Sequence, residues 1–281
     1  MPVRQRCDDR RFPRSHPRTY RGRPLDGRHA RDLPQRRARR RDLRRRVEAV
    51  EQEVRGEGLV GMTDVSEASL RPTRFIDSDS PAIVAFAEGH AGDGDGDDRD
   101  RAVRLYYVVR DHVRYDMTAF GLDPRQFVAS HCLAAPSAFC VPKAVALAAV
   151  ARAAGIPARV GFADVRNHLT SPRIAAMMED DVFRWHAYTA LHLDGKWVKA
   201  TPAFDIVLCE RHGVMPLDFD GREDSIFHPF DATGRRHMEY IRFHGEFDDM
   251  PFEQFATEMR AAYPRMLAAL EEERAARARA G

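Results

Sequence analysis

Cys140 stands at the start of a predicted helix, a position that activates thiols. Pro142 lies just inside the start of the apolar run 144–154, and Gly155 and Pro157 follow its end. These residues favour the two ends of a helix in this order. The unpaired N–H groups and the helix dipole at such a start favour a thiolate, so we expect the pKa of Cys140 to fall below the free value of about 8.5. The pattern indicates a nucleophilic cysteine, although many cysteines are simply small buried residues.

A histidine follows on a predicted β-hairpin. Residues 183–193 alternate as a strand does, and 196–201 form the predicted return strand. Asp194-Gly195 between them is a strong signal for a two-residue hairpin turn. His186 is therefore expected on the first strand, well before the turn.

The register of this hairpin predicts which residues surround the histidine. With a two-residue turn, His186 faces Ala203, and its diagonal neighbours on the same face are Thr201 and Asp205. Pro202 cannot donate to the ladder, so the pairing beyond residue 200 is less strongly specified. An imidazole and a carboxylate are expected on one face.

These residues suggest one kind of chemistry. A cysteine at a helix start, a histidine on a strand and an acid beside that histidine can act as nucleophile, general base and orienting group. Cys140, His186 and Asp205 are therefore the candidate catalytic residues. Such a set attacks carboxamide or peptide carbonyls and forms a thioester, and it requires no metal or cofactor.

The same segments resemble the transglutaminase-like superfamily, which includes bacterial thiol amidases, peptide N-glycanases and true transglutaminases. The resemblance covers roughly residues 82–205. It is carried by FCVPKA and ARAAGIPARVGF within Phe139–Phe162, by WHA at Trp185–Ala187 and by DGKWV at Asp194–Val198. It implies an α+β, papain-like fold in which the helix bearing the cysteine packs on an antiparallel sheet bearing the histidine.

The sequence departs from the family pattern at the third catalytic position. Most members have an aspartate just before a proline on the return strand, where this chain has Thr201-Pro202. A threonine cannot stabilise an imidazolium by charge, so Asp205 is the predicted substitute. The oxyanion would be stabilised by the backbone N–H of Cys140, with Gln126 and Ser137 as candidates for a second donor.

The composition of the chain limits the classes of partner that we expect. Residues 1–46 contain 18 Arg and 5 Asp, which leaves a net charge of −11 on the other residues of a chain whose total is +2. An acidic body repels phosphates, so nucleic acid is not expected to bind the folded domain. No stretch reaches the length of a membrane helix, and the four cysteines show no paired spacing. We predict a cytoplasmic protein with reduced thiols and a peptide or amide substrate, and the oligomeric state is left open.

The chain divides into three predicted parts. Residues 1–60 form a basic leader that has too few apolar residues to fold. The leader could be a nucleic-acid arm, or upstream sequence before a natural start near Met62. Residues 63–265 form the predicted domain, and 266–281 form a C-terminal helix and tail. Within the domain we expect helices from 81, over 98–113 and over 252–263, a strand over 158–163, and a segment without clear periodicity over 206–251.

Two other interpretations of the candidate site compete with an enzyme. The Thr201 departure is compatible with an inactive binding module that keeps the fold and has lost the reaction. A metal site of Cys140, His168, His186 and His192 is disfavoured, because His186 and His192 lie about 20 Å apart along a strand. The acidic loop with Asp93, Asp95 and Asp97 lacks the glycine and glutamate of a calcium loop. His212, His228, His237 and His244, together with Cys132 and Cys209, are interpreted as structural.

Overall fold

The computed structural model describes residues 65–92, 96–167, 172–226 and 238–280. All of these residues belong to one unit of the chain, Leu43–Gly281. The predictions for the leader, for Asp93 and Asp95, and for His168, His228 and His237 fall outside the described residues. The elements are η2 (Glu67–Ser69), α2 (Pro81–His90), α3 (Asp98–His112), β1 (Arg114–Tyr115), η3 (Met117–Ala119), η4 (Pro124–Phe127), α4 (Ala129–Ala134), β2 (Ser137–Ala138), α5 (Cys140–Ala153), β3 (Ala158–Asn167), α6 (Pro172–Met178), β4 (Val182–Leu193), β5 (Lys196–Ala200), α7 (Ile206–His212), β6 (Met238–Phe247), α8 (Phe252–Ala262) and α9 (Pro264–Ala280).

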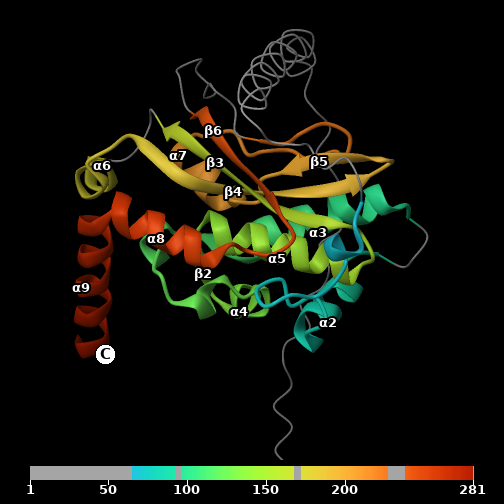
Figure 1. Cartoon of the computed structure of the whole chain (residues 1–281), viewed down its shortest axis with the longest axis horizontal. Helices are drawn as coiled ribbons and strands as arrows, with labels where there is room; N and C mark the ends of the chain where they lie inside the picture. The colour runs from blue at the N-terminus through green and yellow to red at the C-terminus, as the bar shows by residue number, and fades with distance from the viewer. Residues whose placement is uncertain (1–64, 93–95, 168–171, 227–237, 281) are drawn as a thin grey trace, which may run out of the picture. The chain divides into compact units, whose positions relative to one another are not determined.

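A four-stranded antiparallel sheet of order β5-β4-β3-β6 forms one layer of the unit (Figure 1). The hairpin of β4 and β5 has the predicted register, since Leu193 pairs with Lys196 and Thr189 pairs with Ala200. A second sheet consists of β1 and β2, which pair in parallel. The helix that begins at Cys140 packs on the four-stranded sheet, which confirms the predicted α+β fold class.

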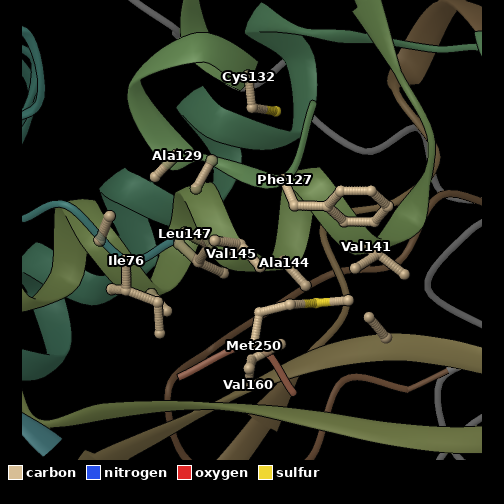
Figure 2. Packing of buried hydrophobic residues seen from close by; sticks show 14 of the residues in the cluster. Ile76, Phe127, Ala129, Cys132, Val141, Ala144, Val145, Leu147, Val160 and Met250 are labelled. Atoms are coloured by element: carbon tan, nitrogen blue, oxygen red, sulfur yellow. The ribbon is translucent and has the colours of Figure 1, made fainter. Parts of the chain in front are cut away.

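Helix α5 is the centre of the core. Residues 141–152 are all buried, as expected for a helix that is apolar on every side. Figure 1 shows α5 lying along one face of the sheet, and the Thr189 hydroxyl on β4 donates to the Ala144 carbonyl over 2.8 Å. In Figure 2, side chains of α5 such as Leu147 lie among Ile76, Phe127 and Met250. Tight packing on all sides fixes where α5 begins and hence where Cys140 lies.

The segment 206–251 is more regular than predicted. It contains α7 and the strand β6, which pairs with β3 along the edge of the sheet. Only the inward side chains of β6, such as Met238, Tyr240 and Phe243, are buried, so polar residues separate the apolar ones. The register of β6 with β3 also shifts twice. An edge strand with such irregularities leaves a weak periodic signal, because its pattern does not keep a period of two.

The C-terminal helices belong to the same core. Helix α8 buries Phe255 and Met259, and α9 adds Met266 and Leu270. These positions confirm the two predicted helices near the C-terminus. No helix among the described residues combines the length and the hydrophobicity that crossing a bilayer would require.

Gly161 leaves the space that a buried tyrosine occupies. It lies on β3 opposite Tyr188 of β4, and a Cβ built on Gly161 would overlap the Tyr188 ring. Because Tyr188 is only 2% exposed, the ring cannot simply swing into solvent. We expect Gly161→Ala to lower the free energy of unfolding by about 1–3 kcal/mol, as measured by urea denaturation. In a Tyr188→Ala background the same change should cost little, and an equal cost in both backgrounds would contradict the steric explanation.

Candidate active site

Cys140 is the first residue of α5, as predicted, and its sulfur faces β4. The backbone N–H groups of Ala187, Val141 and Cys140 are placed to favour the thiolate. Burial nevertheless dominates and raises the pKa of the Cys140 thiol to about 11, although these N–H groups act in the opposite direction. The prediction of a lowered pKa is therefore wrong for this resting state, because the helix start is enclosed by the sheet and the surrounding apolar side chains.

His186 lies on β4 directly before Ala187, whose N–H favours the Cys140 thiolate. The imidazole is 5% exposed, and burial lowers the pKa of His186 to about 3. Both side chains line the same cavity. The structure thus brings the predicted nucleophile and base together as a neutral thiol and a neutral imidazole.

These pKa values predict how Cys140 reacts with a simple alkylating agent. With a pKa of about 11, the thiolate fraction at neutral pH is on the order of 10² times smaller than for a free cysteine. We expect the rate of alkylation by iodoacetamide to keep rising through pH 9–10. A rate that is already constant between pH 5 and 8 would instead show a stable thiolate–imidazolium pair and contradict the prediction. Mass spectrometry of the Cys140 peptide measures the rate.

The cavity is bounded mainly by apolar side chains. It encloses about 590 Å³, part of which is open to solvent. Apart from the cysteine and the histidine, its walls carry Asn167, Arg184 and the tyrosines Tyr115 and Tyr263 as polar residues. Besides aromatic rings, the walls carry five methionines from separate parts of the chain: Met117, Met178, Met238, Met259 and Met266. Methionine is flexible and polarisable, so such walls can adapt to apolar groups of different shapes.

Asp205 occupies a different position from the one that the hairpin register predicted. The ladder between β4 and β5 ends at Ala200, and the chain then pairs with Ser225. The two oxygens of Asp205 accept hydrogen bonds from Leu208 N at the start of α7 (2.9 Å) and from Tyr115 N (2.7 Å). Burial opposes ionisation of Asp205, but these N–H groups and the charge of Lys143 lower its pKa overall. The carboxylate is therefore ionised and holds β1 beside α7, and its action on His186 stays a prediction.

The two predicted side-chain donors for the oxyanion lie outside the cavity walls. Gln126 is on η4 and Ser137 is on β2, and neither contributes to the lining. The side-chain oxygen of Gln126 is buried without a hydrogen-bond partner. The structure therefore does not bring either residue to Cys140.

Tyr115 is a cavity residue that the sequence did not single out. Its strand β1 pairs with β2, and Tyr115 lies opposite Ala138, two residues before Cys140. Burial raises the pKa of Tyr115 well above its usual value, and Cys140 adds to this effect where its sulfur is ionised. The phenol is thus neutral, and its hydroxyl donates to Met117 Sδ over 3.6 Å. A two-residue strand leaves no periodic signal, which is why the pattern could not reveal it.

The remaining cysteines and histidines do not form a second centre within the described ranges. Cys132 and Cys209 are buried free thiols, and burial raises their pKa values to about 12 and about 11. His192 packs against Trp197 with ring centroids 5.3 Å apart. No group of three or more His, Cys, Asp or Glu residues in these ranges is arranged to hold a metal ion.

A family model and a solved structure are similar to this chain. The family model of the transglutaminase-like superfamily matches residues 86–202, which include Cys140 and His186 and end before Asp205. No curated protein matches the sequence. A crystal structure of a "Putative Cysteine Protease" from Cytophaga hutchinsonii is similar over 66% of this chain, with 16% identity and a TM-score of 0.38. The match spans 57% of that protein's chain.

The matched interval contains the structural parts on which the sequence resemblance depends. It runs from α2 to the residues just after β5, and so includes α5 and the hairpin with His186. Residues 86–202 of this chain match the family model of the transglutaminase-like superfamily.

Proposed function

We propose that this protein is a thiol enzyme that cleaves a carboxamide or peptide bond through a thioester on Cys140. The observation that carries the proposal is that the Cys140 and His186 side chains line one cavity, where the Ala187 N–H directly after His186 favours the thiolate. A reactive sulfur, a base and space for a substrate meet at one point. The steps below use no metal.

The reaction follows from the positions of these groups. The Cys140 sulfur attacks the carbonyl carbon while the thiol proton passes to His186, so thiolate and imidazolium character develop together and attract each other. His186 then gives the proton to the leaving amine as the C–N bond breaks, leaving a thioester. Water attacks the thioester with His186 again as the base, and the acid and the free thiol are released.

Two groups can stabilise the oxyanion formed in these steps. The N–H groups at the start of α5 are placed to favour negative charge there, and Tyr115 lines the same cavity, where its hydroxyl could turn from Met117 to the oxyanion. Asp205 then contributes indirectly, because its carboxylate holds the Tyr115 backbone over 2.7 Å. This arrangement replaces Gln126 and Ser137 as the source of a second donor.

The cavity walls favour a substrate with an apolar side chain next to the scissile carbonyl. Met117, Phe204 and Met259 are among the wall residues, and burying an apolar group against such walls stabilises the complex by about 25 cal/mol per Å² of surface removed from water. A cationic side chain would lose its hydration without gaining a partner, because the cavity walls carry no Asp or Glu. The preferred substrates are therefore peptide amides with aromatic or large aliphatic residues on the acyl side.

A substrate profile of the wild type beside Cys140→Ala tests the proposal. The panel contains peptide amides and glutamine peptides that differ only in the residue on the acyl side, with water or methylamine as the acceptor. We expect Cys140-dependent release of the amine, fastest for apolar residues, and a thioester adduct at Cys140 by mass spectrometry. Faster product formation with methylamine would change the assignment from hydrolysis to amine transfer. Equal turnover by Cys140→Ala, or no turnover of any panel member, would remove the proposed function.

A binding module is the second candidate, and a specific observation favours it. Burial keeps the Cys140 thiol protonated and lowers the pKa of His186 to about 3, whereas a general base works best with a pKa near the working pH. In that case the cavity would bind an apolar peptide without cleaving it. The profile above separates the two candidates, because a binding module would retain peptides equally well as wild type and as Cys140→Ala, without forming an adduct.

A further inference from the structure

Strand β4 contains an extra residue directly before His186. Along β3 the pairing moves by two residues, from Val165 to Ala163, while along β4 it moves by three, from Phe183 to His186. This is a β-bulge, in which two residues of one strand lie opposite one residue of the other. Because Ala163 and Val165 share a face, Phe183 and His186 share that face too, although a regular strand would place them on opposite faces. His186 is the last residue of the regular ladder that runs to Leu191, and the bulge sets how the strand continues away from it, with Phe183 on the same face.

The backbone of the bulge is in an unfavourable conformation. Trp185 has φ of 56°, in the left-handed region that a bulky residue rarely adopts. Such a conformation persists only when its surroundings hold it. Two side chains hold the backbone at Trp185. Arg184 N donates to the Tyr263 hydroxyl over 2.8 Å, and Trp185 N donates to Asp164 Oδ1 over 3.0 Å.

Asp164 forms a buried pair with His244 beside Trp185. Its Oδ1 also accepts a hydrogen bond of 2.7 Å from His244 Nε2, and the His244 ring stacks on the Trp185 ring with centroids 4.5 Å apart. Asp164 is 6% exposed and Trp185 is 1% exposed. Burial opposes ionisation of Asp164, but the bonds from His244 and Trp185 lower its pKa overall. An ionised carboxylate only accepts hydrogen bonds, so Nε2 of His244 carries the proton.

The indole has a further partner on α8. Its Nε1 donates to Glu258 Oε2 over 2.7 Å. Trp185 is thus held at its backbone by Asp164, across its ring by His244 and at its indole nitrogen by Glu258. A contact set this complete is more than packing a tryptophan requires, and the next residue along the chain is His186.

We propose that Asp164 and His244 are positioning residues that hold the strained Trp185 bulge and thereby direct His186 toward Cys140. This inference rests on the proposed function, because it assigns a role relative to the Cys140–His186 reaction. Neither residue touches the reacting atoms. Without Asp164, the Trp185 N–H loses its acceptor, and relaxation of this strained residue would displace the adjoining His186 from its position beside the cavity.

The test is the acylation of Cys140 by p-nitrophenyl acetate, which transfers its acetyl group to the sulfur and releases p-nitrophenolate. We expect Asp164→Ala to acylate about 10- to 100-fold more slowly, since small displacements of a catalytic group have effects of this size. Asp164→Asn keeps an Oδ1 acceptor and should recover most of the rate. The matched control is Asp248→Ala. Asp248 binds Arg159 over 2.9 Å, and Arg159 is a buried residue of β3, the strand that also carries Asp164. This variant should keep the wild-type rate within a few-fold.

A double-mutant cycle separates positioning from general destabilisation. In a His186→Ala background, Asp164→Ala should cause no further slowing, because no base is left to misplace. If Asp164→Ala fails to fold, His244→Phe serves instead, since it keeps the ring stacked on Trp185 but removes the donor to Asp164.

The outcomes separate a failure of the positioning role from a failure of the proposed function. Equal slowing by Asp164→Ala and Asp248→Ala, or undiminished slowing in the His186→Ala background, would overturn the positioning role alone. If His186→Ala itself acylates at the wild-type rate, the proposed function fails first.

Discussion

The His186→Ala variant is expected to acylate Cys140 from p-nitrophenyl acetate about 10²- to 10⁴-fold more slowly than the wild type, the usual contribution of a general base. The Cys140 thiol is protonated at neutral pH, because burial raises its pKa to about 11. Attack on a carbonyl therefore requires a neighbouring acceptor for the proton, and His186 shares the cavity with the sulfur. Stopped-flow measurement of p-nitrophenolate release gives the rate.

His192→Ala is the matched control for this experiment. His192 lies on the same strand, pairs with Trp197 in β5 and does not line the cavity. Its replacement should leave the acylation rate unchanged. Similar rates for wild type, His186→Ala and His192→Ala would show that the sulfur reacts without a base, and the binding module would become the better interpretation.

Acidification is expected to destabilise the protein through His186 well before most carboxylates titrate. The folded state holds this imidazole neutral, with a pKa of about 3 against 6.5 for an ordinary histidine. Between these values the unfolded chain binds one proton more than the folded chain, so the free energy of unfolding falls as the pH falls. The slope is about 1.4 kcal/mol per pH unit, or about 3 kcal/mol between pH 6.5 and pH 4. Urea denaturation at a series of pH values measures it.

Two variants isolate the contribution of the histidine. His186→Gln removes the titrating group and should flatten the dependence by about one proton between pH 6.5 and pH 4. Cys140→Ala should keep the wild-type slope, because a thiol of raised pKa is uncharged in both states over this range. Asp164 and Asp205 have lowered pKa values, so the stability that they contribute is lost only at still lower pH. An unchanged slope in His186→Gln would contradict the assignment of a buried neutral imidazole.

Local signals in the sequence were sufficient for the helix and the hairpin that carry the reactive pair. Pro142 and Gly155 mark the two ends of α5, and the Asp194-Gly195 turn sets the register of β4 and β5. Each of these signals depends on the backbone preferences of one or two residues. Such preferences act locally and can be recognised without knowing the rest of the fold.

The features that the sequence did not reveal depend on distant contacts. The bulge at Trp185 interrupts a segment that alternates like an ordinary strand, and Asp164, 21 residues away, stabilises it. Asp205 was assigned by extending the hairpin ladder, but the chain leaves β4 after Ala200 and the carboxylate holds Tyr115 instead. The lowered pKa expected for Cys140 followed from the helix start alone, and the burial that reverses it comes from the sheet.

The cavity is built from a longer part of the chain than the part that matches the family model. The stretch that defines the family stops at residue 202, but part of the cavity wall comes from Met238 on β6, Phe255 on α8 and Met266 on α9. Asp205, which holds Tyr115, also lies beyond that stretch. A fragment cut at the family boundary would keep the sulfur and the imidazole but lose the enclosure that makes them neutral and selective. The stretch that matches the family model is thus shorter than the set of residues that encloses this cavity.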